Sequence, residues 1–257
     1  LHLCDRRQRQ MCIRDSYKEN REIMNGLYYG YGGTVDMFLL LAGFLITLIA
    51  QIKVKSAYSK YSKEDTRGDL SGCEIARKIL DSADLKDIHI VEVPGELTDH
   101  YDPRNKVVRL STKVFHDSSV ASVAVAAHEC GHAIQDKENY TFMKIRASLV
   151  PMVNFVNKFG YIATIIGLIA GIFDILVCGI VMILATLLFQ LVTLPVEFDA
   201  SKRAKKKIDE LKLASKSEQN GVKSMLSAAA FTYVASVLES LFQLLRLVLR
   251  FRDREDR

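Results

Sequence analysis

The chain has 257 residues, of which 49% are hydrophobic, and a formal net charge of +5 at pH 7. The apolar residues are concentrated in long blocks, a composition that excludes an ordinary soluble enzyme and favours a membrane protein. The charge does not indicate nucleic-acid binding, because the densest basic run, at 202–207, adjoins an apolar block and has no interleaved aromatic residues.

The first 16 residues are basic and polar and show no periodicity. Residues 1–16 resemble the translated sequencing-adapter sequence that contaminates some reading frames. We expect them to be a non-native artefact and leave them out of the fold prediction. The alternative is a genuine, disordered basic N-terminus.

An apolar block at residues 35–52 is the first predicted transmembrane helix. Its length is close to the roughly 20 residues that a helix needs to cross a bilayer, and its one acidic residue lies at its edge. The next segment, 53–150, is predicted to be a small soluble α+β unit. Residues 70–80 have the pattern of a capped amphipathic helix, and residues 88–93 and 106–110 have the pattern of strands.

The most informative motif of the chain is His128-Glu-Cys-Gly-His132. Residues 117–119, Asp-Ser-Ser, are good N-cap residues for a helix that carries the motif, and positions i and i+4 of a helix share one face. His128 and His132 can therefore present two imidazoles to one zinc ion, while Glu129 is offset, where it can accept a proton from water. The alternative is a pair of helix histidines that cap or bridge other groups in a core.

Two further apolar blocks, at 159–173 and 175–192, predict a transmembrane helical hairpin at 159–192. The turn at 171–174 has no lysine or arginine, whereas the other ends of the three spans are basic. The positive-inside rule places the basic ends in the cytoplasm and the turn outside. The flanking residues are Lys53, Lys55, Lys60 and Lys63, then Lys144, Arg146 and Lys158, then Lys202, Arg203, Lys205, Lys206 and Lys207.

A catalytic zinc usually has three protein ligands, and the segment 193–225 offers two acids for the third position. The two hairpin crossings return the chain to the side of His132, so Glu197 or Asp199 can meet the histidines. The two acids diverge by about 200° on a helix, so only one can face the metal. Pro195 fits the first turn of a new helix, and the longer side chain favours Glu197. The alternative for each acid is ordinary pairing with the lysines that follow.

A fourth apolar block, at 226–250, is less regular than the others. It carries Glu239, Gln243 and Arg246 at spacings of four and three, which places them on one helical stripe. The block could cross the bilayer, lie in the interface, or pack against the other helices.

Three stretches of the chain resemble the YugP-like family of bacterial membrane zinc metallopeptidases. They are AAHECGHAIQD, LTDHYDPRNKVVRLS and FQLVTLPVEFDASKRA, and the resemblance runs from about residue 38 to about residue 251. The chain also resembles, more distantly, HtpX-like and prenyl-protein membrane proteases, in which the glutamate of a Glu-x-x-Ala-Asp motif completes the zinc site. Glu197 and Ala200 match that motif, whereas Ser201 replaces its aspartate, so the supporting carboxylate is absent there or comes from Asp199.

The residues and the resemblance together predict a mainly α integral membrane protein. It would have a zincin-like α+β protease domain on the cytoplasmic face of the bacterial plasma membrane and three to four transmembrane helices. We expect a zinc-dependent endopeptidase of the gluzincin type, with His128, His132 and Glu197 as Zn²⁺ ligands and with Glu129 as the general base toward a zinc-activated water. The expected partners are the lipid bilayer and a protein or peptide substrate, itself membrane-associated.

Two other functions remain open at the level of sequence. The first is an intramembrane protease, which the polar flanks of the motif helix, at 117–119 and 135–138, disfavour. The second is a non-catalytic zinc-binding membrane scaffold, which the intact Glu129 disfavours.

Two parts of the substrate site can be proposed from sequence. His100, Tyr101 and Tyr140 could stabilise the oxyanion, although an exposed loop residue is the simpler interpretation of each. The strand at 106–110 could bind substrate by edge pairing, by analogy with other zincins.

Overall fold

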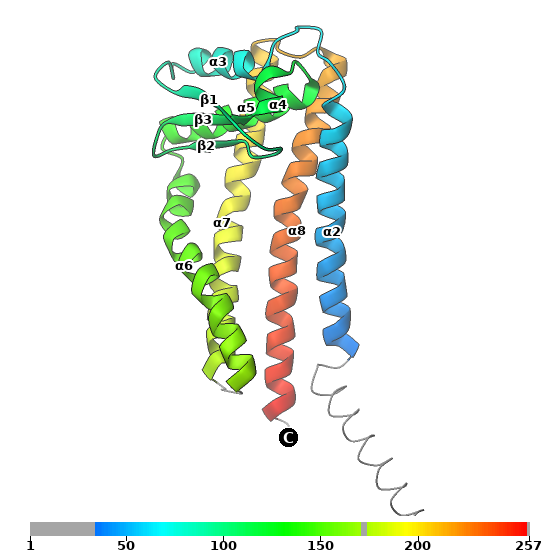
Figure 1. The fold of residues 1–257 in the computed structure, drawn as a ribbon, viewed down its shortest axis with the longest axis vertical. Coiled ribbons are helices and arrows are strands. Elements are labelled where there is room, and N and C mark those ends of the chain that lie inside the picture. Colours follow the sequence, from blue (N-terminus) through cyan, green and yellow to red (C-terminus); the bar gives the residue numbers. More distant parts are fainter. Residues whose placement is uncertain (1–33, 171–173, 256–257) are drawn as a thin grey trace, which may run out of the picture.

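An α/β unit lies at one end of a row of long helices in the computed structural model, which describes residues 34–170 and 174–255 (Figure 1). The long helices among these residues are α2 (Thr34–Tyr61), α6 (Thr141–Ala170), α7 (Asp174–Glu210) and α8 (Lys216–Glu255). α8 packs against both α2 and α7, and α6 packs against α7. The protein is therefore mainly helical, and α8 runs beside α2 and away from the α/β unit (Figure 1).

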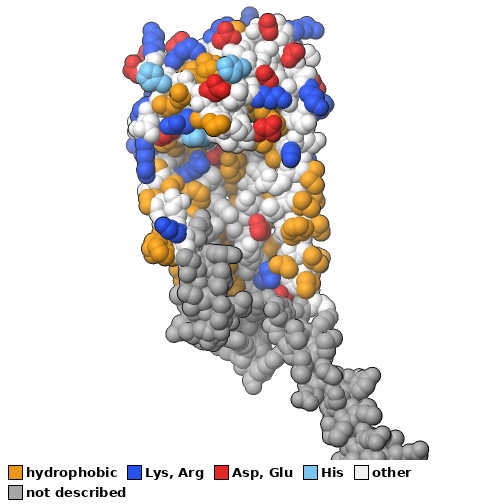
Figure 2. All heavy atoms as spheres, in the orientation of Figure 1, with side chains coloured by type: hydrophobic (Ala, Val, Ile, Leu, Met, Phe, Trp, Pro, Cys, Tyr) orange, Lys and Arg blue, Asp and Glu red, His pale blue; other side chains and the backbone are white. Residues whose placement is uncertain are grey.

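Three of the described helical segments are long and apolar enough to cross a membrane: Thr34–Tyr61, Val181–Glu210 and Lys216–Leu249. Large apolar side chains such as Phe38 and Phe44 are exposed on α2, as expected for a surface that contacts lipid. Figure 2 shows charged side chains gathered over the α/β end and hydrophobic side chains along the helices below it. This separation of polar and apolar surfaces is that of a membrane protein with a polar head.

The polar stripe of α8 faces α2. Thr47 Oγ1 donates a hydrogen bond to Glu239 Oε2 over 3.3 Å, and Gln243 Nε2 donates to Glu239 Oε1 over 3.0 Å. Arg246 pairs with the buried Asp36 at 3.1 Å. Because the polar groups of the stripe have partners inside the bundle, α8 can present its apolar residues to lipid.

The α/β unit is a three-stranded sheet packed with three helices. Its elements are α3 (Gly72–Ser82), β1 (His89–Val93), β2 (His100–Asp102), β3 (Val107–Ser111), α4 (Thr112–His116) and α5 (Val120–Lys137). The strand order is β1-β3-β2, with β1 parallel and β2 antiparallel to β3. Ile75 and Ile79 of α3 and Val108 and Leu110 of β3 are buried in one core with the small apolar residues of α5. The core fixes α5 between the sheet and the long helices.

Local signals explain the helix starts of the unit. Ser71 and Glu74 form a capping box at α3, and the Ser119 side chain accepts a hydrogen bond from the Ser122 backbone at α5. The predicted helix at 70–80 and the predicted strands at 88–93 and 106–110 are confirmed to within two residues at each end.

The prediction that the strand at 106–110 binds substrate along its edge is wrong. This strand is β3, which is hydrogen-bonded on one side to β1 and on the other to β2, so it has no free edge. The edge strands of the described sheet are β1 and β2, and β2 carries Tyr101. With only three residues, β2 is too short to produce an alternating pattern that sequence analysis could recognise.

The prediction that a new helix begins at Pro195 is also wrong. α7 continues through Pro195, so Glu197 lies in the interior of a 37-residue helix. Proline removes one backbone hydrogen bond there, a loss that long membrane helices tolerate when they pack against neighbours. The expectations for residues 1–16 and for the turn at 171–173 lie outside the described residues, as do most side chains of the predicted span at 159–173.

Candidate metal centre

α5 and α7 bring the predicted metal ligands together. His128 and His132 lie on α5 and Glu197 lies on α7, and the two helices touch where Gly131 meets Ala200. A Cβ atom at Gly131 would lie only 2.6 Å from the Ala200 backbone oxygen. The glycine inside the motif therefore allows the approach of the two backbones that sets Glu197 opposite the histidines.

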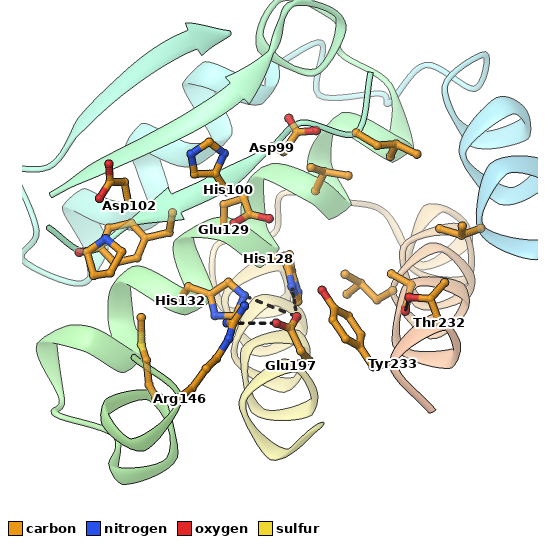
Figure 3. A pocket seen from close by; sticks show the side chains of 18 of the residues that line it. Asp99, His100, Asp102, His128, Glu129, His132, Arg146, Glu197, Thr232 and Tyr233 are labelled. Atoms are coloured by element: carbon orange, nitrogen blue, oxygen red, sulfur yellow. Dashed lines mark hydrogen bonds and ion pairs between the residues drawn. The ribbon is translucent and has the colours of Figure 1, made fainter. Parts of the chain in front are cut away.

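The three side chains form a compact set of donor atoms (Figure 3). Glu197 Oε2 lies 3.2 Å from His128 Nε2 and 3.6 Å from His132 Nε2, and one ligand atom from each residue lies within 4.8 Å of the other two. Zinc bonds of about 2.0–2.2 Å in tetrahedral geometry predict about 3.3 Å between ligand atoms. The donor set fits a zinc ion in chemistry, and the two distances from Glu197 to the histidines match this spacing.

A hydrogen bond on the far side of His132 fixes its tautomer. Its Nδ1 lies 3.0 Å from Gln135 Oε1, while Gln135 Nε2 donates to the Val196 backbone oxygen at 2.8 Å. The amide oxygen of Gln135 must therefore accept from Nδ1–H, which leaves the Nε2 lone pair of His132 directed at Glu197.

His128 has an equivalent support. Its Nδ1 lies 3.3 Å from the Ser201 hydroxyl, which can accept the Nδ1 proton. Ser201 stands where the Glu-x-x-Ala-Asp motif has its aspartate, and in this structure it contacts His128 directly. Asp199 takes a different place: it accepts from Gln135 Nε2 at 2.9 Å and pairs with Arg203, away from the histidines.

Glu129 is buried beside the ligands and faces a cavity of about 640 Å³. Burial is the main cause that raises its pKa to about 7, because removal from water disfavours the carboxylate. The charge of Glu197 acts in the same direction, and that of His128 opposes it. Glu129 is thus a carboxyl group that can exchange a proton near neutral pH.

The cavity lies at the junction of the α/β unit and the long helices. The β2 region contributes Tyr101, α6 contributes Arg146, and α8 contributes Thr232 and Tyr233 (Figure 3). Arg146 Nη1 lies 3.3 Å from Glu197 Oε1, the oxygen that does not face the histidines. Sequence analysis had used Arg146 only as a topology signal and had not considered Tyr233, because neither residue belongs to a local motif.

The three residues considered for oxyanion stabilisation have different surroundings. The Tyr101 hydroxyl donates to Asp136 over 2.7 Å, and Tyr140 packs beside Phe142 and does not line the cavity. His100 lines the cavity, with its Nδ1 2.9 Å from the Thr98 backbone oxygen.

Two imidazoles from one helix and a carboxylate from a later one form a donor set of the kind that binds zinc, and they lie at one end of the long apolar helices. The chain belongs to the family described as "Putative neutral zinc metallopeptidase", which matches residues 36–252. It is 44% identical over 220 residues to the "Putative membrane protease YugP" of Bacillus subtilis (strain 168), a match that covers 86% of this chain and 98% of the relative. The resemblance to YugP-like peptidases is thereby confirmed. No solved structure matches the chain significantly.

Proposed function

We propose that the chain is a membrane-bound zinc endopeptidase in which His128, His132 and Glu197 hold the metal and Glu129 is the general base. The observation that carries the proposal is the convergence of three donor atoms whose histidines are fixed from behind by Gln135 and Ser201. Zinc bound there would polarise the scissile carbonyl and make water a nucleophile at neutral pH.

Glu129 would accept the proton of the attacking water and deliver it to the leaving amine. Its burial next to the ligands and its pKa near 7 support both transfers, because a group that is equally ready to gain and lose a proton suits a base that later acts as an acid. Intact Glu129 also disfavours a scaffold that binds zinc only for structure.

The cavity supports an extended peptide as substrate. Residues of the β2 region line it, and among the described residues β2 is paired only with β3, so one edge of β2 can exchange backbone hydrogen bonds with another chain. α6 and α8 extend the lining with Val150 and Ala229. This junction favours a substrate held at the membrane surface, and the basic flanks of the helices favour the cytoplasmic face.

The test is the variant Glu129→Gln, purified in detergent and compared with the wild type. We expect one zinc ion per chain in both proteins and loss of nearly all peptide cleavage in the variant, because an amide cannot accept the proton. Cleavage of casein or a membrane-protein substrate at the wild-type rate would show that Glu129 is not the base. Absence of zinc from the wild type would contradict the metal site itself.

A further inference from the structure

Tyr233, on the membrane helix α8, points its hydroxyl into the candidate site. The side chain is half-buried and lines the same cavity as the three ligands. In Figure 3 the Tyr233 ring lies beside Glu197, with its hydroxyl on the side of the Glu197 carboxylate and His128. α8 packs against α7, which holds the ring at this place.

Hydrolysis of a peptide bond needs a hydrogen-bond donor at the carbonyl oxygen, where negative charge develops when water adds to the carbon. The proton acceptor Glu129 approaches from α5, so the donor must come from another side of the cavity. Tyr233 reaches the ligands from α8 and therefore meets this requirement (Figure 3). A phenol is also protonated at neutral pH and has one O–H to donate.

The other polar groups around the cavity are less suited to this role. The Tyr101 hydroxyl is engaged by Asp136, and the guanidinium of Arg146 is paired with Glu197 Oε1. His100 is an exposed side chain on the β2 side of the cavity, with one ring nitrogen at the Thr98 oxygen. The Tyr233 hydroxyl, in contrast, lines the cavity, and its proton can turn toward a substrate oxygen.

We propose that Tyr233 is a catalytic residue that donates a hydrogen bond to the oxyanion formed during peptide hydrolysis. The inference rests on the proposed peptidase function. It also gives the C-terminal helix a role in the chemistry, because α8 then completes the site as well as the membrane bundle.

The experiment compares Tyr233→Phe with Tyr140→Phe, which deletes the same hydroxyl outside the cavity. We expect Tyr233→Phe to keep one zinc per chain and a KM within about threefold of the wild type while kcat falls by about 10²- to 10³-fold, the usual effect of losing one oxyanion donor. A peptide phosphinate, whose tetrahedral anion resembles the transition state, should lose affinity for Tyr233→Phe by a similar factor. Tyr140→Phe should match the wild type in all four measurements.

Two results would overturn the proposal. Unchanged kcat and phosphinate affinity in Tyr233→Phe would show that the hydroxyl does not contact the oxyanion. Loss of zinc from this variant would assign the hydroxyl to the support of Glu197 instead. Both results require a wild type that binds zinc and cleaves peptide, so they are distinguishable from failure of the proposed function, which would overturn the two proposals together.

Discussion

Replacement of Gly131 by alanine tests the contact on which the candidate metal centre depends. The new Cβ would lie 2.6 Å from the Ala200 oxygen and 3.2 Å from the Ala200 Cα, both of which are backbone atoms. Cβ contacts below 3.0 Å are essentially never found, so α5 and α7 must move apart by about 0.4 Å at least, and by about 0.8 Å to reach an ordinary contact of 3.4 Å.

Two effects of this substitution oppose each other. Alanine favours a helix over glycine by about 1 kcal/mol, whereas overpacking of a tight contact costs about 1–3 kcal/mol. The metal-free fold should therefore lose between zero and about 2 kcal/mol of stability. The gain in helix propensity does not compensate for a loss of zinc affinity. Metal–ligand distances are tolerated only within about 0.2 Å, and Glu197 is three residues from Ala200, where the helices touch. If the clash is relieved by separating the ligands, its cost appears in zinc affinity, and about 10- to 100-fold weaker binding follows.

The assay is chelator competition with the purified protein in detergent, combined with thermal unfolding of the metal-free form. Gly68→Ala is the control, because a Cβ at Gly68 meets no described atom within 4 Å. We expect wild-type zinc affinity for Gly68→Ala and weaker binding for Gly131→Ala. Equal affinities in the three proteins would refute the argument that this glycine sets the distance between the ligands.

Three other predictions concern the groups around the site and the bundle. Glu197→Ala should lose zinc, whereas Asp199→Ala should retain it. The measurement is the zinc content of each purified variant, and the reverse pattern would make Asp199 the third ligand in place of Glu197. Gln135→Leu should lower zinc affinity by about 10- to 100-fold, because the Nδ1 proton of its histidine loses its acceptor; unchanged affinity in chelator competition would show that the amide does not orient the ring. In the bundle, Asp36→Arg or Arg246→Asp alone should lower the unfolding temperature in detergent, because each substitution leaves two like charges facing each other between α2 and α8. The double variant, in which the two charges are exchanged, should recover part of this loss. A double variant no more stable than the singles would contradict this pairing.

Sequence patterns located the elements whose signals are local. The caps at Ser71 and Ser119 and the spacing of His128 and His132 act within one or two helical turns, so they are visible without a structure. Glu197 was reachable by counting membrane crossings, which is a topological argument. The position of Glu197 inside a continuous helix could not be predicted from sequence, because a helix continues through Pro195 only when it packs against neighbouring helices.

The groups that sequence analysis missed depend on contacts between distant segments. Arg146 and Tyr233 reach the cavity because α6 and α8 pack on opposite sides of Glu197. The periodicity of a single helix does not indicate which residues of two distant helices come together. In the sequence, Arg146 resembles an ordinary residue at the end of a membrane span, and Tyr233 resembles an ordinary helix residue. The polar stripe of α8 is an intermediate case. The spacing of its polar residues predicted that they share one stripe of the helix, but only the structure shows that this stripe faces Asp36 and Thr47.

Ser201 and Gln135 explain how the site can do without the aspartate of the related motif. A ligand histidine needs an acceptor at Nδ1 so that Nε2 keeps its lone pair, and a hydroxyl or an amide oxygen provides one as well as a carboxylate does. The structure places these neutral acceptors behind His128 and His132, whereas the nearby carboxylate of Asp199 pairs with Arg203. The acceptors behind the two histidines are thus both uncharged. Ser201 therefore supplies the hydrogen-bond acceptor that His128 needs, without the charge that an aspartate would carry.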